Sequence, residues 1–350
     1  MFNALTNGKA LAANYPFATK DPNLGVISVP DARLDQLAEL VQPQRTLPTT
    51  VEILDIAGLI KGASKGEGLG NQFLANIREV DAIIHVVRCF DDDNVVHVDG
   101  SVNPIRDKEI IDLELGLKDL ETVEKRLDKV ARGARTGNRD DQRILDVLTV
   151  VKPHLEQGRS ARELLSTLDD DGKATLRELS LLTAKPVLYV CNVDENAVLT
   201  GNNYTQIFQA SVAAEGAEVI LICAGIEAEI AELDTREDRL EFLSAMGLNE
   251  PGVNKLIHSA YKLLNLITYF TAGEKEVRAW TVRRGAKAPE AAGVIHSDFE
   301  KGFIRAEVIK YLDFTTLGSE AKVKEAGKMA VEGQEYEVGD GDIMHFRFNV

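Results

Sequence analysis

Five short runs rich in valine and isoleucine constrain the fold of this chain more than any other feature of its sequence. They lie at residues 25–29, 50–55, 82–89, 186–192 and 218–223. Most of them are continuously apolar, whereas a strand with one face in water alternates apolar and polar residues. Helix-period stretches lie between them, for example at residues 31–41 and 71–80. This order predicts an α/β fold with a doubly wound, mostly parallel sheet.

A long helical segment interrupts this pattern between the third and fourth apolar runs. Within residues 109–185, apolar side chains recur at helical spacing, namely Ile111, Leu115, Leu120, Val123, Leu127 and Val130. A glycine-containing polar turn at residues 132–139 leads into a second apolar-periodic run at 144–155. We therefore predict a helical hairpin inserted between two strands of the sheet.

The tip of this predicted hairpin is basic. Six cations lie close together in the sequence there: Lys125, Arg126, Lys129, Arg132, Arg135 and Arg139. A solvated helix face is the ordinary interpretation of such a run, and a patch that contacts nucleic acid is the alternative. The whole chain has 56 acidic and 40 basic residues and a formal net charge of −16, which repels phosphate from a broad surface. Any RNA contact must therefore use a local basic patch.

The last part of the chain, from about residue 261, has a different pattern. Short strands are predicted around turn residues, and one helical segment is predicted at 318–327. The predicted strands are residues 277–282, 302–308, 336–338 and 342–348. This pattern indicates an α+β module of about ninety residues. Because it contains no catalytic constellation, we expect a binding or docking domain.

Cysteine usage and hydropathy indicate a cytoplasmic protein. The three cysteines, Cys89, Cys191 and Cys223, are an odd number without metal-binding spacing, which fits a reducing compartment. All three lie in or next to predicted strands, where we expect buried, inert thiols. The longest apolar stretch, residues 82–87, is far too short to cross a membrane, and the N-terminal residues do not resemble a signal peptide.

The second apolar run ends in the pattern D-x-x-G, with Asp55 and Gly58. Ligands of open parallel sheets bind at the carboxyl ends of the strands, and in nucleoside triphosphatases an Asp at this point reaches the Mg²⁺ sphere. A chance strand-and-turn sequence matches such a short motif equally well. The next segment, residues 61–70, has four glycines in ten residues, as a loop needs if it changes between two backbone states. A flexible linker is the other interpretation, but this segment lies between a core strand and an amphipathic helix.

The fourth apolar run is followed by the sequence Asn-Val-Asp-Glu at residues 192–195. GTP-binding proteins carry N-K-x-D here, and the Asp accepts two hydrogen bonds from guanine. Glu195 is one methylene longer and Val193 replaces the Lys, so the guanine contact is not reproduced. The Asn192 amide can still pair with the N6/N7 edge of adenine. This motif favours ATP over GTP; a polar turn that caps a helix is the structural alternative.

Several segments together resemble the YchF/Obg-like ATPase family of P-loop NTPases over nearly the whole chain. They are Asn-Tyr-Pro-Phe-Ala-Thr at 14–19, Leu-Pro-Thr-Thr at 47–50, the D-x-x-G motif with the loop at 61–71, the motif at 192–195, and residues 265–273. The resemblance implies an ATPase with an OBG-type G domain at residues 1–260, interrupted by the hairpin at 109–185. It also implies a TGS domain of β-grasp fold at 261–350. Its implied partners are ATP, Mg²⁺ and the ribosome, with a role in translation or stress response, and neither DNA nor a membrane.

The resemblance assigns roles by position. Thr19 and Asp55 would be the Mg²⁺ ligands, and Gly58 would belong to the second switch. The base pocket would comprise Asn192, Val193 and Glu195, with backbone groups from Cys223, Ala224 and Gly225. The switch loop would include Lys61, Gly62, Gly66, Gly68 and Gly70.

One departure from the family pattern concerns the phosphate cradle. The family places a strand and a Walker A loop directly before the segment that matches residues 2–6, and no G-x-x-x-x-G-K-[ST] motif occurs in the printed sequence. We expect these 350 residues to bind ATP poorly, and we expect the sequence to begin at an internal methionine of a longer protein.

Leu59 follows the D-x-x-G glycine where Ras-like enzymes place a water-orienting Gln, so hydrolysis is expected to be slow. His97 is the candidate to position the attacking water, with a purely structural histidine as the alternative. Candidate RNA contacts are on the hairpin, at Arg126, Lys129, Arg132 and Arg135, and in the C-terminal module, at Arg278, Arg283 and Arg284. Two functions remain open: an ATP-driven switch, or a docking protein that acts independently of nucleotide.

Overall fold

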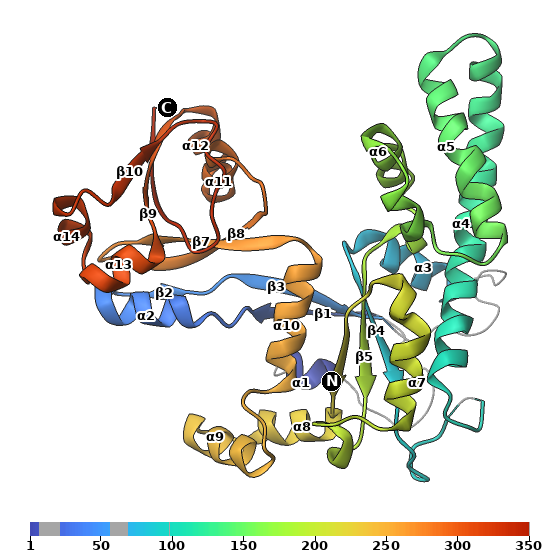
Figure 1. Ribbon diagram of the computed structural model, residues 1–350, viewed down its shortest axis with the longest axis horizontal. Helices are drawn as coiled ribbons and strands as arrows, with labels where there is room; N and C mark the ends of the chain where they lie inside the picture. Colours follow the sequence, from blue (N-terminus) through green and yellow to red (C-terminus); the bar gives the residue numbers. More distant parts are fainter. Residues whose placement is uncertain (7–21, 57–68, 98, 350) are drawn as a thin grey trace. The chain divides into compact units, whose positions relative to one another are not determined.

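The computed structural model describes residues 1–6, 22–56, 69–97 and 99–349 (Figure 1). It divides the chain into two compact units. Unit 1 comprises Met1–Gly25 and Leu54–Val253, and unit 2 comprises Val26–Ile53 and Asn254–Val350. The segment at residues 26–53 therefore belongs to the same unit as the C-terminal module. The domain boundaries drawn from the resemblance stay predictions.

The core of unit 1 is a parallel sheet of β4 (Ile83–Arg88), β5 (Val187–Asn192) and β6 (Val219–Ile222), in the order β4-β5-β6 (Figure 1). In central β5, the first five residues are each at most 6% exposed. This burial on both faces explains the continuously apolar sequence. Helices α7 (Asn203–Val212), α8 (Ala224–Glu232) and α9 (Arg236–Ala245) contribute Phe208, Ile226 and Leu243 to the same core.

The first two apolar runs also form strands, β1 (Asn23–Ser28) and β3 (Thr50–Asp55). In the described part of the chain they pair with each other in a separate two-stranded sheet. Burial alternates along β1, and Leu24 and Val26 are 62% and 59% exposed. The expectation of burial on both faces is therefore wrong for this strand, because its alternate side chains face solvent.

The predicted helical hairpin is confirmed as α4 (Pro104–Arg135) and α5 (Arg139–Glu156), which pack through Val123, Val130, Leu148 and Val151. Helix α4 begins before the predicted segment because Asn103 caps it, accepting a hydrogen bond from the Arg106 N–H at 3.1 Å. The chain continues through η2 (Ala161–Ser166), α6 (Asp170–Leu179) and η3 (Leu182–Ala184). The remaining helices described in unit 1 are α1 (Phe2–Thr6), α3 (Leu69–Glu79), η4 (Glu195–Ala197) and η5 (Ala213–Glu215).

Unit 2 contains a six-stranded mixed sheet in the order β10-β9-β11-β7-β8-β2. Its strands are β2 (Thr46–Leu47), β7 (Leu266–Ala272), β8 (Val277–Arg283), β9 (Phe303–Ile309), β10 (Met329–Glu332) and β11 (Ile343–Phe348). Its helices include α11 (Ala288–Ile295), α12 (Ser297–Lys301), α13 (Tyr311–Leu317) and α14 (Glu320–Glu325). Helix α10 (Gly252–Leu263) leads into this unit. The predicted α+β module is confirmed, including its helical segment near 318–327.

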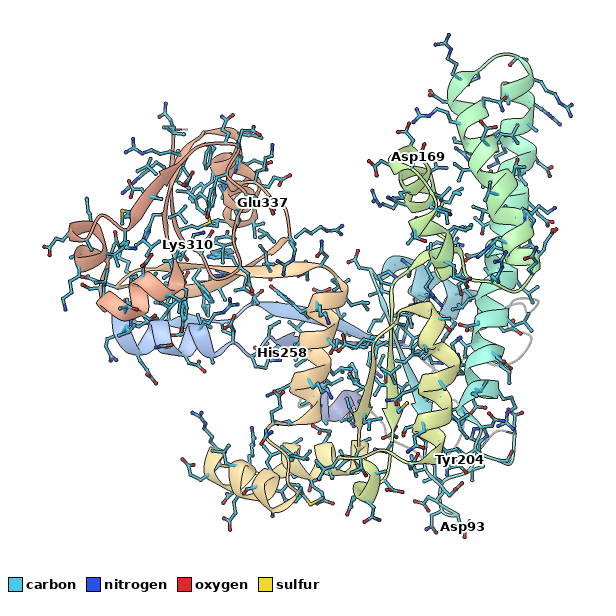
Figure 2. All side chains as sticks on the ribbon, viewed as in Figure 1. Asp93, Asp169, Tyr204, His258, Lys310 and Glu337 are labelled. Atoms are coloured by element: carbon cyan, nitrogen blue, oxygen red, sulfur yellow. The ribbon has the colours of Figure 1, made fainter. Side chains whose placement is uncertain are left out.

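The strand predicted at residues 336–338 is wrong. These residues form only an isolated bridge, between Lys287 and Glu337. The neighbouring Asp342 is 1% exposed and organises a turn: it accepts hydrogen bonds from Lys310 Nζ at 2.7 Å, Tyr336 Oη at 2.5 Å and Gly339 N at 2.7 Å (Figure 2 labels Lys310). Polar contacts to one buried carboxylate therefore replace a strand ladder here.

Helix α2 (Ala32–Val41) is built into unit 2. Leu34 and Leu37 pack with Phe270, Val277 and Ile309 in one apolar cluster. The Arg33 guanidinium joins Asp31 at 2.8 Å to Asp340 at 3.1 Å. Strand β2 then pairs in parallel with the start of β8. No helix in the described residues is long and apolar enough to span a membrane.

A buried carboxylate attaches the hairpin to the rest of unit 1. Asp119 on α4 is fully buried and accepts hydrogen bonds from Leu182 N, Thr183 N and Thr183 Oγ1, each at 2.7 Å. Burial raises the pKa of Asp119, while the three donors act in the opposite direction. The contact fixes η3, which leads directly into β5.

We expect Asp119→Ala to lower the free energy of unfolding by about 2–4 kcal/mol, because it leaves buried N–H groups without an acceptor. Urea unfolding measures the effect. Asp128→Ala on the same helix is the matched control, since Asp128 is exposed, and should change stability by less than about 0.5 kcal/mol. Equal losses in the two variants would contradict the proposed anchoring.

Candidate functional site

The carboxyl ends of β4, β5 and β6 are joined by backbone hydrogen bonds. Cys89 N donates to Asn192 O at 2.8 Å, and Val193 N donates to Ile222 O at 2.9 Å. The parallel register places Arg88, Asn192 and Ile222 side by side. Residues that follow the strands in the sequence therefore meet at one edge, where open parallel sheets bind ligands.

The Asn192 side chain is fixed at this edge. Its Oδ1 accepts a hydrogen bond from Ala224 N at 3.0 Å, at the start of α8. This contact brings together two segments that the sequence proposed separately for the base pocket, namely Asn192 and the Cys223–Ala224–Gly225 turn. With Oδ1 accepting from Ala224, the Nδ2 group is left to donate to a ligand.

The other proposed base-pocket residues differ in exposure. Val193 is 2% exposed and belongs to the core that contains Phe208, so its side chain supports the strand end. Glu195 is exposed in η4, and Asp194 caps that turn by accepting from Ala197 N at 3.0 Å. Of the residues in the 192–195 motif, Asn192 and Glu195 are thus the ones with side chains available to a base.

All three cysteines are free and buried, as the sequence predicted. Burial raises the pKa of Cys223, although the Ile226 and Gly225 N–H groups act in the opposite direction. The pKa of Cys89 is also raised, first by a hydrogen bond with Cys191 and then by burial. The Cys89 and Cys223 thiols therefore stay protonated at neutral pH.

The proposed metal ligands and switch loop are described only in part. Asp55 ends β3 and is partly buried. Thr19, Gly58 and the loop residues Lys61, Gly62, Gly66 and Gly68 lie outside the described residues. Gly70 lies in the first turn of α3, which buries Leu74 and Ile77 against Leu115 and Leu182. The helix that follows the glycine-rich loop is thus packed against α4 and η3.

His97 lies between β4 and α4 with both ring nitrogens engaged. Its Nε2 is 3.0 Å from Asp107 Oδ2, and its Nδ1 accepts from Asp99 N at 3.1 Å. The Nδ1 contact places the ring proton of a neutral imidazole on Nε2, facing the carboxylate. To contact a nucleotide-bound water, the ring must give up one of these partners.

Among the described residues, His97, Asp99 and Asp107 also form one cluster whose possible metal-ligand atoms all lie within 4.8 Å of one another. Arg106 occupies the same cluster, 3.0 Å from Asp107 and 3.6 Å from Asp99. Because the guanidinium already pairs with both carboxylates, we interpret this arrangement as an ion-pair network at the start of α4.

The candidate RNA contacts are distributed over both units. Arg126, Lys129, Arg132 and Arg135 all lie on α4. In unit 2, the Arg278 guanidinium lies over the Trp280 ring at 3.8 Å from its centroid, and Arg283 ends β8 next to Arg284.

Asn202 is a further polar residue at the strand ends that was not predicted from the sequence. Its Nδ2 donates to Cys89 O at 2.7 Å, and its side chain caps α7. The signal for it was the Asn-Asn-Tyr-Thr capping pattern at 202–205.

We expect Asn192→Ala to lower the free energy of unfolding by about 1 kcal/mol, because the Ala224 N–H loses its partner. Asn196→Ala removes the same side chain from an exposed position in η4 and should be nearly neutral. Urea unfolding of both variants checks the difference. A stable Asn192→Ala protein would show that the contact does not hold α8 to the strand end.

Comparisons with known proteins cover the whole chain. A family model described as "50S ribosome-binding GTPase" matches residues 1–125. The model of the YchF GTPase C-terminal domain, described as a protein of unknown function, matches residues 266–349.

Individual relatives are similar over nearly all of their length. The ribosome-binding ATPase YchF of Escherichia coli O157:H7 is 56% identical over 350 residues, which is all of this chain and 95% of the relative. The protein of the same name from Bacillus subtilis strain 168 is 53% identical over 352 residues, with the same coverage. The structure of the Schizosaccharomyces pombe YchF GTPase matches with a TM-score of 0.86 and 39% identity, over 99% of this chain and 93% of that one. This chain belongs to the YchF family.

Proposed function

We propose that this chain is a cytoplasmic ATP-binding switch that hydrolyses ATP slowly, associates with the ribosome and modulates translation or a stress response. The observation that carries the proposal is the Asn192 amide, held at the carboxyl edge of the parallel sheet beside the start of α8. Relatives at 53–56% identity named ribosome-binding ATPase support the assignment.

The base motif supports adenine as the preferred base. Asn192 Nδ2 is available to donate to N7, and the second lone pair of Oδ1 can accept from the adenine N6 amino group. Glu195 replaces the Asp that would hold guanine. A GTPase is the competing activity, and the names of the S. pombe relative and of the N-terminal family model include that word. Competition between the two nucleotides therefore decides between them.

The Mg²⁺ expected with ATP fits the chemistry of the proposed ligands. Asp55 stands at the carboxyl end of β3, and carboxylate and hydroxyl oxygens are ligands that Mg²⁺ prefers. Bound there, the ion would neutralise charge on the phosphates. Asp55 would orient the ion, and Thr19 would supply the hydroxyl.

Chain connectivity supports a switch that acts on unit 2. Residues 26–53 lie between Thr19 and Asp55 in the sequence, and α2 and β2 within this segment pack on the unit 2 sheet. A rearrangement at either proposed Mg²⁺ ligand therefore acts directly on an element of unit 2. This connection would alter how the C-terminal module is presented to a large partner.

Equilibrium binding of fluorescent ATP, competed with ATP or GTP, tests the base assignment. Because the printed residues contain no G-x-x-x-x-G-K-[ST] motif, the assay uses these 350 residues and the same residues preceded by such a strand and loop. We expect the second form to prefer ATP and the first to bind weakly. Failure of both forms to bind would favour the alternative function, a ribosome or RNA docking protein that acts independently of nucleotide.

We expect Glu195→Asp to lower the ratio of ATP to GTP affinity by about tenfold, because the shorter carboxylate restores the guanine contact. Glu229→Asp, at an exposed position of α8, makes the same chemical change away from the site and should leave the ratio unaltered. An unchanged ratio in Glu195→Asp would remove Glu195 from the base pocket.

A catalytic role of His97 predicts that His97→Ala lowers kcat about 100-fold with little change in KM. Asp107→Asn separates this role from a structural one, because it weakens the pairing seen at 3.0 Å and keeps the imidazole. We expect Asp107→Asn to retain kcat within about threefold. Steady-state ATPase kinetics, on the form preceded by the Walker A strand and loop, give both values. An unchanged kcat in His97→Ala would leave His97 as a structural residue.

A further inference from the structure

The first N–H groups of helix α10 are bound by a side chain from another helix. The residue before α10 is Pro251, whose side chain offers no hydrogen-bond acceptor. Glu227 on α8 supplies the acceptors from 25 residues earlier in the chain. Its Oε1 accepts from Gly252 N at 2.7 Å, and its Oε2 accepts from Val253 N at 3.2 Å. One carboxylate of α8 therefore caps α10.

This contact is buried and closely packed. Glu227 is 3% exposed, and a Cβ atom added at Gly252 would lie 2.9 Å from Glu227 Oε1 and 3.3 Å from Ile222 Cγ1. A residue without a side chain thus lets the start of α10 approach the carboxylate. Burial raises the pKa of Glu227, whereas the Gly252 and Val253 N–H groups and the Met1 amino group act in the opposite direction. The carboxylate and the glycine are therefore matched to each other across two helices.

The same turn of α8 forms part of the proposed base site. Ala224 N donates to Asn192 Oδ1 at 3.0 Å, and Glu227 N donates to Cys223 O at 3.1 Å, which closes the first turn of the helix. Ile226 in this turn is 1% exposed and packs in the core of unit 1. A single helical turn thus contacts the strand end through Ala224 and the start of α10 through Glu227.

Helix α10 carries the chain from unit 1, which ends at Val253, into unit 2. Within unit 2 the helix has contacts of its own. His258 Nε2 lies 2.9 Å from Pro30 O, and Tyr261 Oη donates to Thr281 Oγ1 at 2.9 Å (Figure 2 labels His258). A change in the first turn of α10 therefore acts on a helix that belongs to the structure of unit 2.

We propose that Glu227 couples the base site to α10. A shift of the α8 turn at Asn192 moves the carboxylate, which cannot leave the Gly252 and Val253 N–H groups without leaving buried polar groups unpaired. The start of α10 must then follow the α8 turn or lose its cap. Glu227 is in this sense a positioning residue. The coupling is defined by contacts within the chain, and only the ligand that would drive it, ATP, rests on the proposed function.

Hydrogen–deuterium exchange of the complete 350-residue chain tests the coupling. We expect Glu227→Gln to speed exchange in residues 250–258 about tenfold, because glutamine offers one acceptor atom in place of two. Glu229→Gln, at an exposed position of the same helix, is the matched control and should leave exchange there unchanged. Exchange in α7, which packs in the same core, reports any general loss of stability.

A change at the base site then shows whether the carboxylate transmits it. Asn192→Ala alone should speed exchange in residues 250–258 about threefold, and it should have no further effect when Glu227→Gln is present. Additive effects of the two changes, or no effect of Asn192→Ala on these residues, would overturn the coupling.

Gly252→Ala disturbs the same contact from the side of α10. Alanine favours a helix more than glycine does, so intrinsic propensity alone predicts slower exchange at the start of α10. Because the added Cβ would lie 2.9 Å from Glu227 Oε1, we expect faster exchange instead. Slower exchange in Gly252→Ala would show that the position of the carboxylate does not control the helix start, and it would reject the proposal.

The nucleotide competition assay separates this inference from the proposed function. If neither form of the chain binds ATP, while Asn192→Ala still acts on residues 250–258 only through Glu227, the proposed function is wrong and the coupling stands. If ATP binds and Asn192→Ala leaves exchange in α10 unchanged, the function stands and the coupling is wrong.

Discussion

The parallel register of β4, β5 and β6 determines where the chemistry of unit 1 can lie. Because β5 is buried on both faces, it cannot shift by one residue without moving apolar side chains out of the core. The fixed register places Asn192 opposite Ile222, and the turn after β6 then brings Ala224 N to Asn192 Oδ1. The candidate base site thus depends on a strand alignment that hydrophobic burial enforces. Its polar residues contribute contacts only after that alignment exists.

Residues 26–53 lie between the two proposed Mg²⁺ ligands, Thr19 and Asp55, in the sequence. Within this segment, α2 buries Leu34 and Leu37 in the core of unit 2. Pulling α2 away would expose those leucines, at a cost of about 2–3 kcal/mol each. These leucines therefore hold the segment in unit 2, which the proposed switch requires.

Local patterns predicted the elements whose partners are close in the sequence or specified by burial. Continuous apolar runs indicated β4, β5 and β6, and helical spacing at Val123 and Val130 indicated the hairpin. Contacts between distant polar residues left no comparable pattern. The pairing of His97 with Asp107, the burial of Asp119 under η3 and the docking of Arg33 on Asp340 each depend on three-dimensional placement. The wrong strand prediction at 336–338 has the same cause. The sequence there is typical of a strand, but Tyr336 Oη and Gly339 N donate hydrogen bonds to the buried Asp342 carboxylate.

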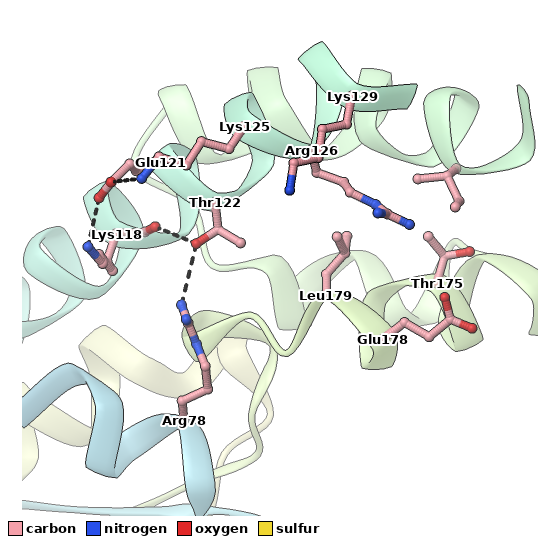
Figure 3. A pocket seen from close by; sticks show the side chains of 11 residues that line it. Arg78, Lys118, Glu121, Thr122, Lys125, Arg126, Lys129, Thr175, Glu178 and Leu179 are labelled. Atoms are coloured by element: carbon pink, nitrogen blue, oxygen red, sulfur yellow. Dashed lines mark hydrogen bonds and ion pairs between the residues drawn. The ribbon is translucent and has the colours of Figure 1, made fainter. Parts of the chain in front are cut away.

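Helix α3 follows the glycine-rich segment in the sequence and packs against the hairpin. It begins at Leu69, and its last turn places Arg78 Nη2 3.4 Å from Thr122 Oγ1 on α4 (Figure 3). Leu74 and Ile77 pack it against Leu115 on α4 and Leu182 in η3. If nucleotide changes the position of α3, a partner that binds the hairpin must change the affinity for nucleotide by the same factor, because binding free energies are linked reciprocally. In the proposed function, α3 is therefore the element that would couple the glycine-rich segment to the hairpin.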